Sequence, residues 1–220
     1  MAFVGYARPP KASRLTEGAS NLIRALILGI TGLVVFSQVS AWANTPADQV
    51  RIAMEEVTRI LQDPSLQLES KALERQALIR AVVSNLFDFP DIARRVLGRH
   101  WSSLTEAEHK EFVTLFRTLL EHTYLPKITQ HQGERARFIG ESLNEGMASV
   151  TTLVITRRGQ EIPVTYRLAQ HGGRWLIFDV LVEGVSLTAN YRAQFDPIIQ
   201  RTSFQDLINR IRQKLAAPGS

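Results

Sequence analysis

The stretch RWLIFDVLVEGVSLTANYRAQF, residues 174–195, decides the fold of this chain. Its first part, residues 175–182, is apolar except for Asp179 and rich in β-branched and aromatic residues, which predicts a strand buried on both faces. After Gly184 the apolar residues change to helical spacing, and Ser186 stands where a helix N-cap belongs. A strand therefore leads directly into a helix. Because such a strand needs an apolar layer on each face, one layer can come from the protein's helices and the other from more protein or from an apolar ligand.

Three further strands are predicted upstream, at residues 135–140, 147–156 and 161–169. Short polar turns separate the four strands: Asn-Glu-Gly at 144–146, Arg-Gly-Gln at 158–160 and Gly-Gly at 172–173. Turns of this length and composition are typical of hairpins. We therefore expect the four strands to form an antiparallel meander.

Helical periodicity covers most of the remaining chain. We expect helices at residues 45–62, 70–87, 91–97, 105–126, 186–200 and 203–215. The longest begins at a capping box of Thr105 and Glu108, three residues apart. Its apolar stripe runs from Phe112 to Tyr124. Such a stripe is typical of a core helix, and it could equally form one wall of an apolar pocket.

The first 43 residues are typical of an export signal. A basic segment precedes an apolar core at 25–36, and Ala-Trp-Ala at 41–43 places small residues at both positions that a signal peptidase reads. We expect a signal peptide at residues 1–43 that is cleaved at its end, a single exported domain at residues 44–216 and a disordered tail at residues 217–220. The alternative is an uncleaved membrane anchor, although the apolar core is short for a bilayer.

Composition and charge narrow the choice of partners. The chain is 45% hydrophobic and 21% charged, as in globular proteins. The leader holds 4 of the 26 basic and 1 of the 21 acidic residues, which leaves 22 and 20. A nearly neutral domain is poorly suited to the many phosphate contacts of nucleic-acid binding, so we expect no nucleic-acid partner. Cysteine is absent, which excludes disulfides and thiol chemistry and suits a bacterial periplasmic domain held by its core.

Motifs of common enzyme classes are absent from the sequence. There is no Gly-x-Ser-x-Gly, Walker loop, Gly-x-Gly-x-x-Gly or His-Glu-x-x-His, and the five histidines include no i, i+4 pair. We expect no catalytic residue, metal or other cofactor, although a metal site assembled from distant segments stays open. Asp179 lies inside an apolar strand, where an unpaired charge would be costly. It is either a catalytic carboxylate or a structural one, satisfied by Arg192 or by backbone donors of the following turn.

Two sets of motifs carry a resemblance to a known family. The specific set is Val-Glu-Gly-Val-Ser-Leu at 182–187, followed by Asn-Tyr-Arg at 190–192. The looser set comprises Phe87-Asp88-Phe89, Val96-Leu97-Gly98, Trp101, Thr105, Glu111-Phe112, Phe116, Leu119-Leu120, Tyr124, Trp175, Phe178-Asp179-Val180 and Gln194-Phe195. With these motifs, residues 45–215 resemble the toluene-tolerance or MlaC family of periplasmic phospholipid-binding proteins.

The resemblance implies an α+β fold in which helices wrap a small antiparallel four-stranded sheet and enclose a deep apolar pocket. The pocket would hold lipid tails with the headgroup outside. The resemblance also implies a monomeric lipid shuttle between an outer-membrane lipoprotein complex and an inner-membrane ABC transporter complex. In this role the protein would maintain the lipid asymmetry of the outer membrane.

Helical and strand periodicity suggest which residues would line such a pocket. One predicted wall consists of Phe112, Phe116, Leu119 and Tyr124. The other consists of Val154, Tyr166, Leu168, Trp175 and Ile177. Phe87 and Phe89 are predicted at the mouth, and Val96, Trp101, Val185 and Tyr191 complete the lipid-binding set.

Three alternatives stay open at this point. A related branch of the family is associated with hopanoids, so the lipid could be a hopanoid. A cone-shaped α+β enzyme would use the same apolar residues around Asp179 as its acid or base. An exported interaction module would have a filled core and no ligand.

Overall fold

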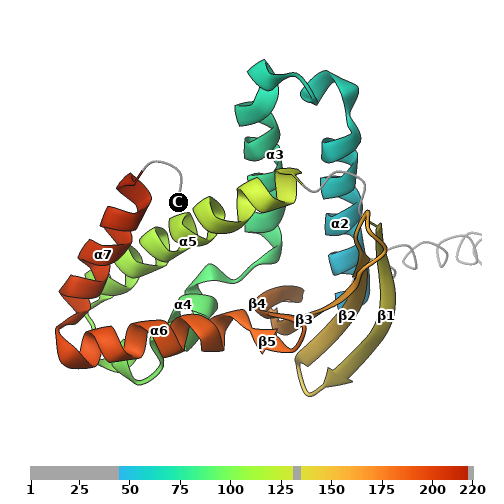
Figure 1. Cartoon of the computed structure of the whole chain (residues 1–220). Helices are drawn as coiled ribbons and strands as arrows, with labels where there is room; N and C mark the ends of the chain where they lie inside the picture. The colour runs from blue at the N-terminus through green and yellow to red at the C-terminus, as the bar shows by residue number, and fades with distance from the viewer. Residues whose placement is uncertain (1–44, 131–134, 218–220) are drawn as a thin grey trace, which may run out of the picture. The chain divides into compact units, whose positions relative to one another are not determined.

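The computed structural model describes residues 45–130 and 135–217, which belong to one compact unit. The predicted signal peptide and residues 218–220 of the predicted tail lie outside the described residues. The helices are α2 (Pro46–Gln62), α3 (Ala72–Leu86), α4 (Phe89–Leu97), α5 (Glu106–Gln130), α6 (Leu187–Arg201) and α7 (Phe204–Ala216). The strands are β1 (Arg135–Asn144), β2 (Met147–Ile155), β3 (Glu161–His171), β4 (Arg174–Val182) and β5 (Val185–Ser186). In the described part of the chain, four α-helices precede the sheet and two follow it (Figure 1).

The sheet is an antiparallel meander in the order β1-β2-β3-β4-β5. The prediction of four strands was wrong by one, because Val185 and Ser186 pair with Val182 and Leu181 before α6 begins. Glu183 and Gly184 have φ values of 51° and 80°, which reverse the chain within two residues. A two-residue strand has too short a pattern to be recognised by periodicity.

Strand β4 is buried on both faces at its centre, as predicted. Ile177, Phe178 and Asp179 are consecutive and all at most 4% exposed. Phe178 is the extra residue of a bulge, since Arg167 pairs with Asp179 and Leu168 pairs with Ile177. The outer edge of β4 is also covered: Phe87 bridges to Ile177, and the Asp88 amide donates to the Ile177 carbonyl oxygen at 2.9 Å. The backbone of β4 is therefore paired on both of its sides, with β3 on one and with Phe87 and Asp88 on the other.

Side-chain caps fix most helix starts. The hydroxyl of Ser186 accepts from the Ala189 amide, and that of Ser203 accepts from the Asp206 amide, both at 3.1 Å. The capping box is confirmed, because the Thr105 amide donates to the Glu108 carboxylate at 2.8 Å. Helix α4 begins earlier than predicted, at Phe89, because the Asp88 carboxylate caps it and Pro90 fits its first turn.

Three buried clusters hold these elements together. The helix cluster joins α4, α5, α6 and α7 and comprises Phe89, Ile92, Ala93, Val96, Leu97, Phe112, Phe116, Leu119, Leu120, Tyr191, Phe195, Phe204, Leu207, Ile208 and Ile211. The sheet cluster joins α2 to β2, β3 and β4 and comprises Val50, Ala148, Val150, Leu168, Trp175 and Ile177. The hairpin cluster joins α2 and α3 to α5 and comprises Ile60, Leu66, Ile79 and Leu125.

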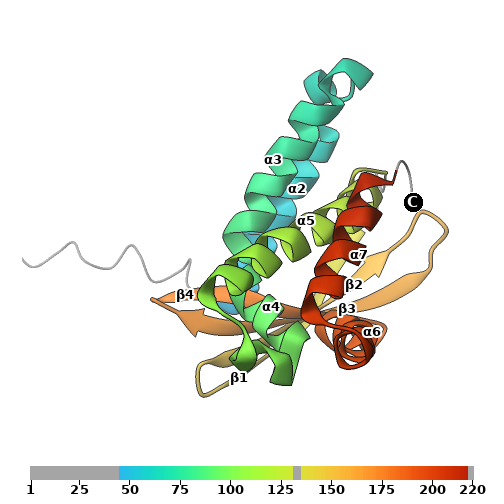
Figure 2. The same cartoon turned by 90° about the vertical axis from the view of Figure 1, so that its left-hand side faces the viewer.

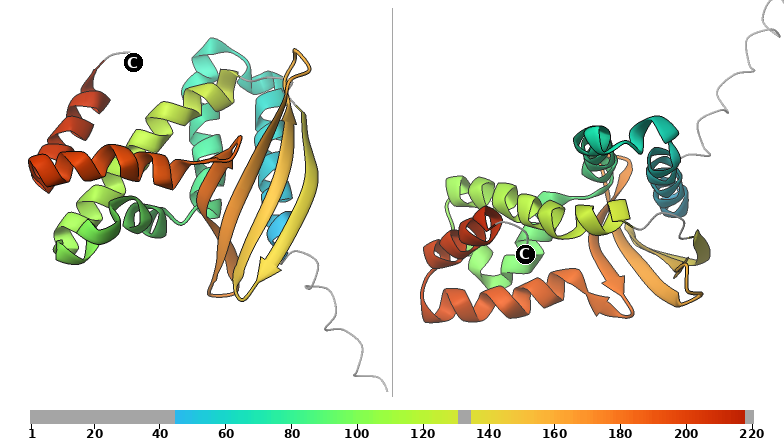
Figure 3. Two further views of the ribbon diagram at one scale, coloured as in Figure 1. Left: turned by 60° about the horizontal axis from the view of Figure 1, so that its bottom comes forward. Right: turned by 45° about the horizontal axis from the view of Figure 1, so that its top comes forward.

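Helices α2 and α3 lie side by side as a hairpin that projects away from the sheet (Figure 2). At the end of the hairpin that meets the sheet, α2 contacts β2 and lies behind the strands in Figure 3, left, while α3 contacts β4. Helix α6 leaves the sheet at β5 and packs on α4, while α7 returns along α5. Helix α2 takes part in the sheet cluster through Val50 and in the hairpin cluster through Ile60, and Leu86 of α3 also packs against the sheet cluster.

Asp179 is a structural carboxylate in the β4–β5–α6 connection. It is 2% exposed, its Oδ1 accepts from the Thr188 amide at 3.0 Å, and its Oδ2 accepts from the Ser186 hydroxyl at 2.7 Å. The backbone donor that was predicted is thus confirmed. The charged partner is Arg167, whose Nη1 lies 3.5 Å from Oδ2, and not Arg192, which donates to the Arg95 carbonyl oxygen.

Replacing Asp179 by Ala is expected to lower the free energy of unfolding by about 3 kcal/mol, because the buried Thr188 amide loses its acceptor and Arg167 loses its counter-charge. Urea unfolding followed by circular dichroism measures this. The matched control is Glu55→Ala on the exposed side of α2, which should stay within about 0.5 kcal/mol of the parent. Equal stabilities of the two variants would contradict the structural role of Asp179.

Candidate binding site

A cavity of about 750 Å³ lies between α2, α3, α5 and the sheet. Its volume falls within the roughly 300–1,000 Å³ that is usual for small-molecule sites. Its apolar lining comprises Ala53, Met54, Val57, Leu61, Val82, Val83, Leu86, Phe87, Phe89, Ile92, Leu120, Tyr124, Leu125, Ile128, Ala136, Val154, Tyr166, Val180, Val182, Val185 and Leu187. A cavity with walls of this kind binds a ligand by burying apolar surface.

The helical wall follows from the spacing of α2. Ala53, Val57 and Leu61 stand four residues apart and so share one face of the helix. At the two ends of this face, Val50 packs in the sheet cluster and Ile60 in the hairpin cluster. Between these ends, Met54 also packs against the sheet cluster and Val57 and Leu61 against the hairpin cluster, and together with Ala53 they line the cavity.

The sheet wall follows from strand register. Val154 pairs with Ala136, and Tyr166 pairs with Val180, so these side chains lie on the same face of the sheet. All four line the cavity. Leu153, the neighbour of Val154, therefore lies on the opposite face. Val154 and Leu153 are therefore adjacent residues of which only Val154 faces the cavity.

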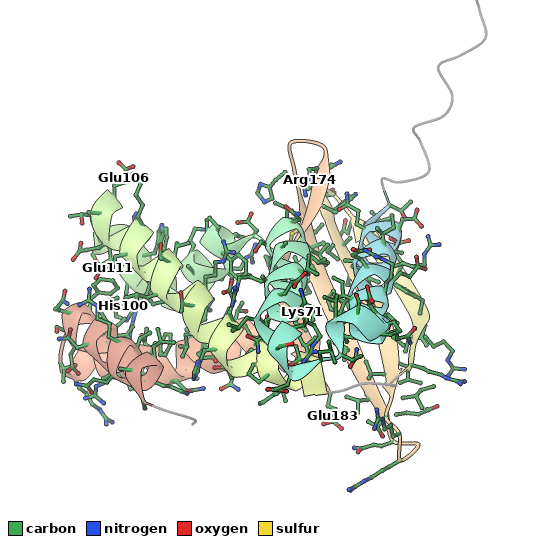
Figure 4. The ribbon with its side chains drawn as sticks, turned by 90° about the horizontal axis from the view of Figure 1, so that it is seen from above. Lys71, His100, Glu106, Glu111, Arg174 and Glu183 are labelled. Carbon is green, nitrogen blue, oxygen red and sulfur yellow. The ribbon has the colours of Figure 1, made fainter. Side chains whose placement is uncertain are left out.

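Polar groups are few in the lining and lie on different elements. They are Thr58, Glu121, Lys127, Arg135, Asp179, Ser186 and Asn190. Asp179 has hydrogen-bond partners on both oxygens, so it offers no free carboxylate to a ligand. Figure 4 shows the elements around the cavity from above, with Lys71 near the start of α3 and Glu183 in the β4–β5 turn.

Six of the fifteen residues predicted from the sequence line this cavity. They are Phe87, Phe89, Tyr124, Val154, Tyr166 and Val185. Five others belong to the helix cluster: Val96, Phe112, Phe116, Leu119 and Tyr191. Leu168, Trp175 and Ile177 belong to the sheet cluster, and Trp101 packs against the helix cluster with its ring stacked on His109. The role of any of these residues in ligand binding stays a prediction.

The stripe of α5 divides between two environments. Phe116 lies in the helix cluster, where its ring centroid is 5.0 Å from that of Tyr191 and 5.8 Å from that of Phe195. Tyr124, two turns further along, lines the cavity and is 37% exposed. Periodicity identified the stripe, but it carries no information on which element covers each turn. Substitution of Phe116 therefore tests packing of the helix cluster.

Sequence reasoning missed the wall formed by α2 and α3. Met54, Val57 and Leu61 stand at helical spacing within the helix predicted at residues 45–62, yet they were not assigned to the pocket. The available signal was the apolar face of this helix. Its residues pack against the sheet cluster and the hairpin cluster and also line the cavity, and spacing alone does not distinguish these surroundings.

The described residues contain no group of three or more His, Asp or Glu side chains that could hold a metal ion. None of the helices in the described part of the chain has the length and apolar character needed to cross a bilayer.

Tyr191 adds a pH dependence to the core. Burial, and next the neighbouring Tyr124, raise the pKa of its hydroxyl to about 12 from the usual 10. The folded state thus favours the neutral phenol, and the resulting stabilisation is complete below pH 10 and is lost as the pH rises through about 12. Between pH 10 and about 12, the unfolding free energy of Tyr191→Phe should therefore fall by about 2 kcal/mol less than that of the parent protein. Urea unfolding at both ends of the range tests this, and an unchanged fall would contradict it.

The chain matches one known protein family and is similar to curated proteins. The family described as "MlaC protein" matches residues 51–213. Two curated proteins are similar to the chain. The toluene tolerance protein ttg2D of Pseudomonas putida is 23% identical over 171 residues, which are 77% of this chain and 80% of that protein. The intermembrane phospholipid transport system binding protein MlaC of Haemophilus influenzae is 20% identical over 159 residues, which are 68% and 74% of the two chains.

A solved structure has the same fold. It is a phospholipid-binding protein from Ralstonia solanacearum in complex with a phospholipid. The TM-score is 0.69 at 21% sequence identity, and the similarity covers 77% of this chain and 96% of that one. At this identity the likeness supports the arrangement of helices and sheet.

Proposed function

The chain belongs to the MlaC protein family, and from this premise we propose that it carries phospholipid, with the acyl chains in the cavity between α2, α3, α5 and the sheet. The observation that carries the proposal is the cavity of about 750 Å³ with a mostly apolar lining. The solved relative from Ralstonia solanacearum, which holds a phospholipid on the same fold, supports it.

The physical need for such a cavity follows from hydration. Each methylene group removed from water contributes about 0.8 kcal/mol, so two acyl chains cannot leave a membrane for water on a useful timescale. A carrier has to enclose the chains and later release them. Apolar walls meet both needs, since contacts with Met54, Val57 and Val154 have no directional requirement.

The setting of this activity is also part of the proposal. Residues 1–43 act as a cleaved signal peptide and export the protein to the periplasm. There it passes lipid, as a monomer, between an outer-membrane lipoprotein complex and an inner-membrane ABC transporter complex, which maintains the asymmetry of the outer membrane. The name of the Haemophilus influenzae relative, an intermembrane phospholipid transport system binding protein, supports this setting. A hopanoid is the alternative cargo.

The enzyme alternative is disfavoured by the surroundings of Asp179. Its oxygens are bonded to the Thr188 amide and the Ser186 hydroxyl, and Arg167 balances its charge. A carboxylate whose two oxygens are hydrogen-bonded and whose charge is balanced positions the β4–β5 turn. We infer that the protein is a binding protein that carries out no reaction on its lipid.

Adjacent residues of β2 provide the test. Val154 faces the cavity and Leu153 the opposite face, and both are half-buried. Val154→Glu places a carboxylate among the acyl chains, so the fraction of protein carrying lipid should fall at least about tenfold. Leu153→Glu should leave it unchanged. Native mass spectrometry of the purified proteins gives the fraction, and extraction of the bound mass identifies the lipid class.

Circular dichroism and thermal unfolding establish that both variants are folded. Equal lipid occupancy in the two folded variants would show that the acyl chains do not lie in this cavity. A parent protein without any bound mass, even after incubation with lipid, would instead indicate an interaction module with a filled core.

A further inference from the structure

A second pocket adjoins the cavity. It has a volume of about 660 Å³ and is lined by Arg80, Ser84, Phe87, Phe89, Pro90, Val113, Thr114, Arg117, Thr118 and Glu121. Phe87, Phe89 and Glu121 line both spaces. The two phenyl rings are stacked with centroids 6.1 Å apart, and they form a shared wall. The cavity and the second pocket are therefore neighbours that share these side chains.

Two guanidinium groups from different helices meet in the second pocket. Arg80 of α3 and Arg117 of α5 each donate through Nε to the Glu121 carboxylate, both at 2.8 Å. Arg117 also donates through Nη2 to the Ser84 hydroxyl at 2.5 Å, and it lies over the Phe89 ring at 5.0 Å. Within residues 45–130 and 135–217, the two Nη atoms of Arg80 and Nη1 of Arg117 have no hydrogen-bond partner.

The hydroxyl groups in the pocket cannot replace the guanidinium groups as donors. Ser84, Thr114 and Thr118 each donate to the backbone carbonyl four residues before them. Pro90 has no amide hydrogen. The available side-chain donors are therefore those of Arg80 and Arg117, and planar guanidinium groups favour the oxygens of a phosphate group.

Charge and shape narrow the ligand further. Two guanidinium groups and one carboxylate leave a charge of +1, which a monoanion balances. A phosphodiester carries a single negative charge, whereas a free phosphate is more highly charged near neutral pH. The apolar part of the lining, Phe87, Phe89, Pro90 and Val113, suits hydrocarbon next to the anion.

We propose that Arg80 and Arg117 bind the phosphodiester of the lipid whose acyl chains occupy the neighbouring cavity. The proposal rests on the proposed function and adds a headgroup site to it. Glu121 and Ser84 position the two guanidinium groups, and the Phe87–Phe89 wall separates the phosphodiester from the acyl chains.

A competition between two lipids tests the proposal. The protein is incubated with equal amounts of dioleoylphosphatidylglycerol and dioleoylglycerol, which share their chains and differ in the phosphodiester. Native mass spectrometry gives the ratio of the two complexes. Since each ratio is measured within one folded population, loss of folded protein does not change it. The parent protein should favour the phosphodiester lipid.

Four substitutions by Gln show which arginines cause the preference for the phosphodiester lipid. Arg80→Gln and Arg117→Gln should each lower the ratio about tenfold, through loss of charge-assisted hydrogen bonds. Arg210→Gln is the matched control, because Arg210 also donates through Nε to a carboxylate, that of Asp206, at 2.8 Å on the exposed face of α7. It should leave the ratio unchanged. Arg135→Gln tests the cationic group that lines the cavity itself.

The outcomes separate this proposal from the proposed function. Binding of both lipids without preference, or a preference that survives Arg80→Gln and Arg117→Gln, overturns the headgroup site and leaves lipid carriage intact. A preference lost only in Arg135→Gln places the phosphodiester elsewhere and also overturns it. Binding of neither lipid by the parent overturns both proposals.

Inorganic phosphate distinguishes a headgroup from a free anion. Added in excess, it should lower the share of phosphatidylglycerol in the parent protein and have little effect in Arg80→Gln, because both ligands use the same guanidinium groups. If phosphorus NMR instead detects phosphate binding that Arg80→Gln abolishes, while the lipid ratio is the same in parent and variant, the pocket binds free phosphate and the headgroup assignment is wrong.

Discussion

The rest of the structure depends on the buried contact between Asp179 and the start of α6. This carboxylate accepts from the Thr188 amide and the Ser186 hydroxyl, and so it fixes the direction in which α6 leaves the sheet. Helix α6 carries Tyr191 and Phe195 into the helix cluster. The packed helical half of the molecule is thereby attached to the sheet at this connection, and a second time where Phe87 and Asp88, just before α4, bond to Ile177. A neutral side chain at this position could not accept both hydrogen bonds and balance Arg167 as well.

The cavity lies next to this tightly packed region. The helix cluster places its aromatic rings close to one another, with centroids 5.0–6.2 Å apart. Three of its members, Phe89, Ile92 and Leu120, also line the cavity, as does Leu125 of the hairpin cluster. The packed clusters and the cavity therefore share side chains at their boundary.

Local features were predictable from the sequence, and spatial ones were not. The caps at Thr105, Ser186 and Ser203 depend on neighbours within three residues, so they could be recognised directly. The pairing of Arg167 with Asp179 depends on the register of β3 against β4 and on the bulge at Phe178, which no local pattern reveals. The same limit explains why spacing alone does not separate Tyr124 and Val154, which line the cavity, from Phe112 and Leu168, which lie on equally apolar stripes in packed clusters.

The α2–α3 hairpin is attached to the sheet at one end. At that end, Gln49 accepts from the Trp175 amide, the Ala47 amide donates to Glu141, and the Asp88 amide donates to Ile177. The far end consists of short 3₁₀ turns with Leu68 and Leu73 exposed. Beyond this end, the hairpin is held by side-chain contacts with α5, through the hairpin cluster and the Arg80–Glu121 ion pair. The helical wall of the cavity is therefore joined to α5 by packing and an ion pair, whereas the strands of the sheet wall are joined to one another by backbone hydrogen bonds.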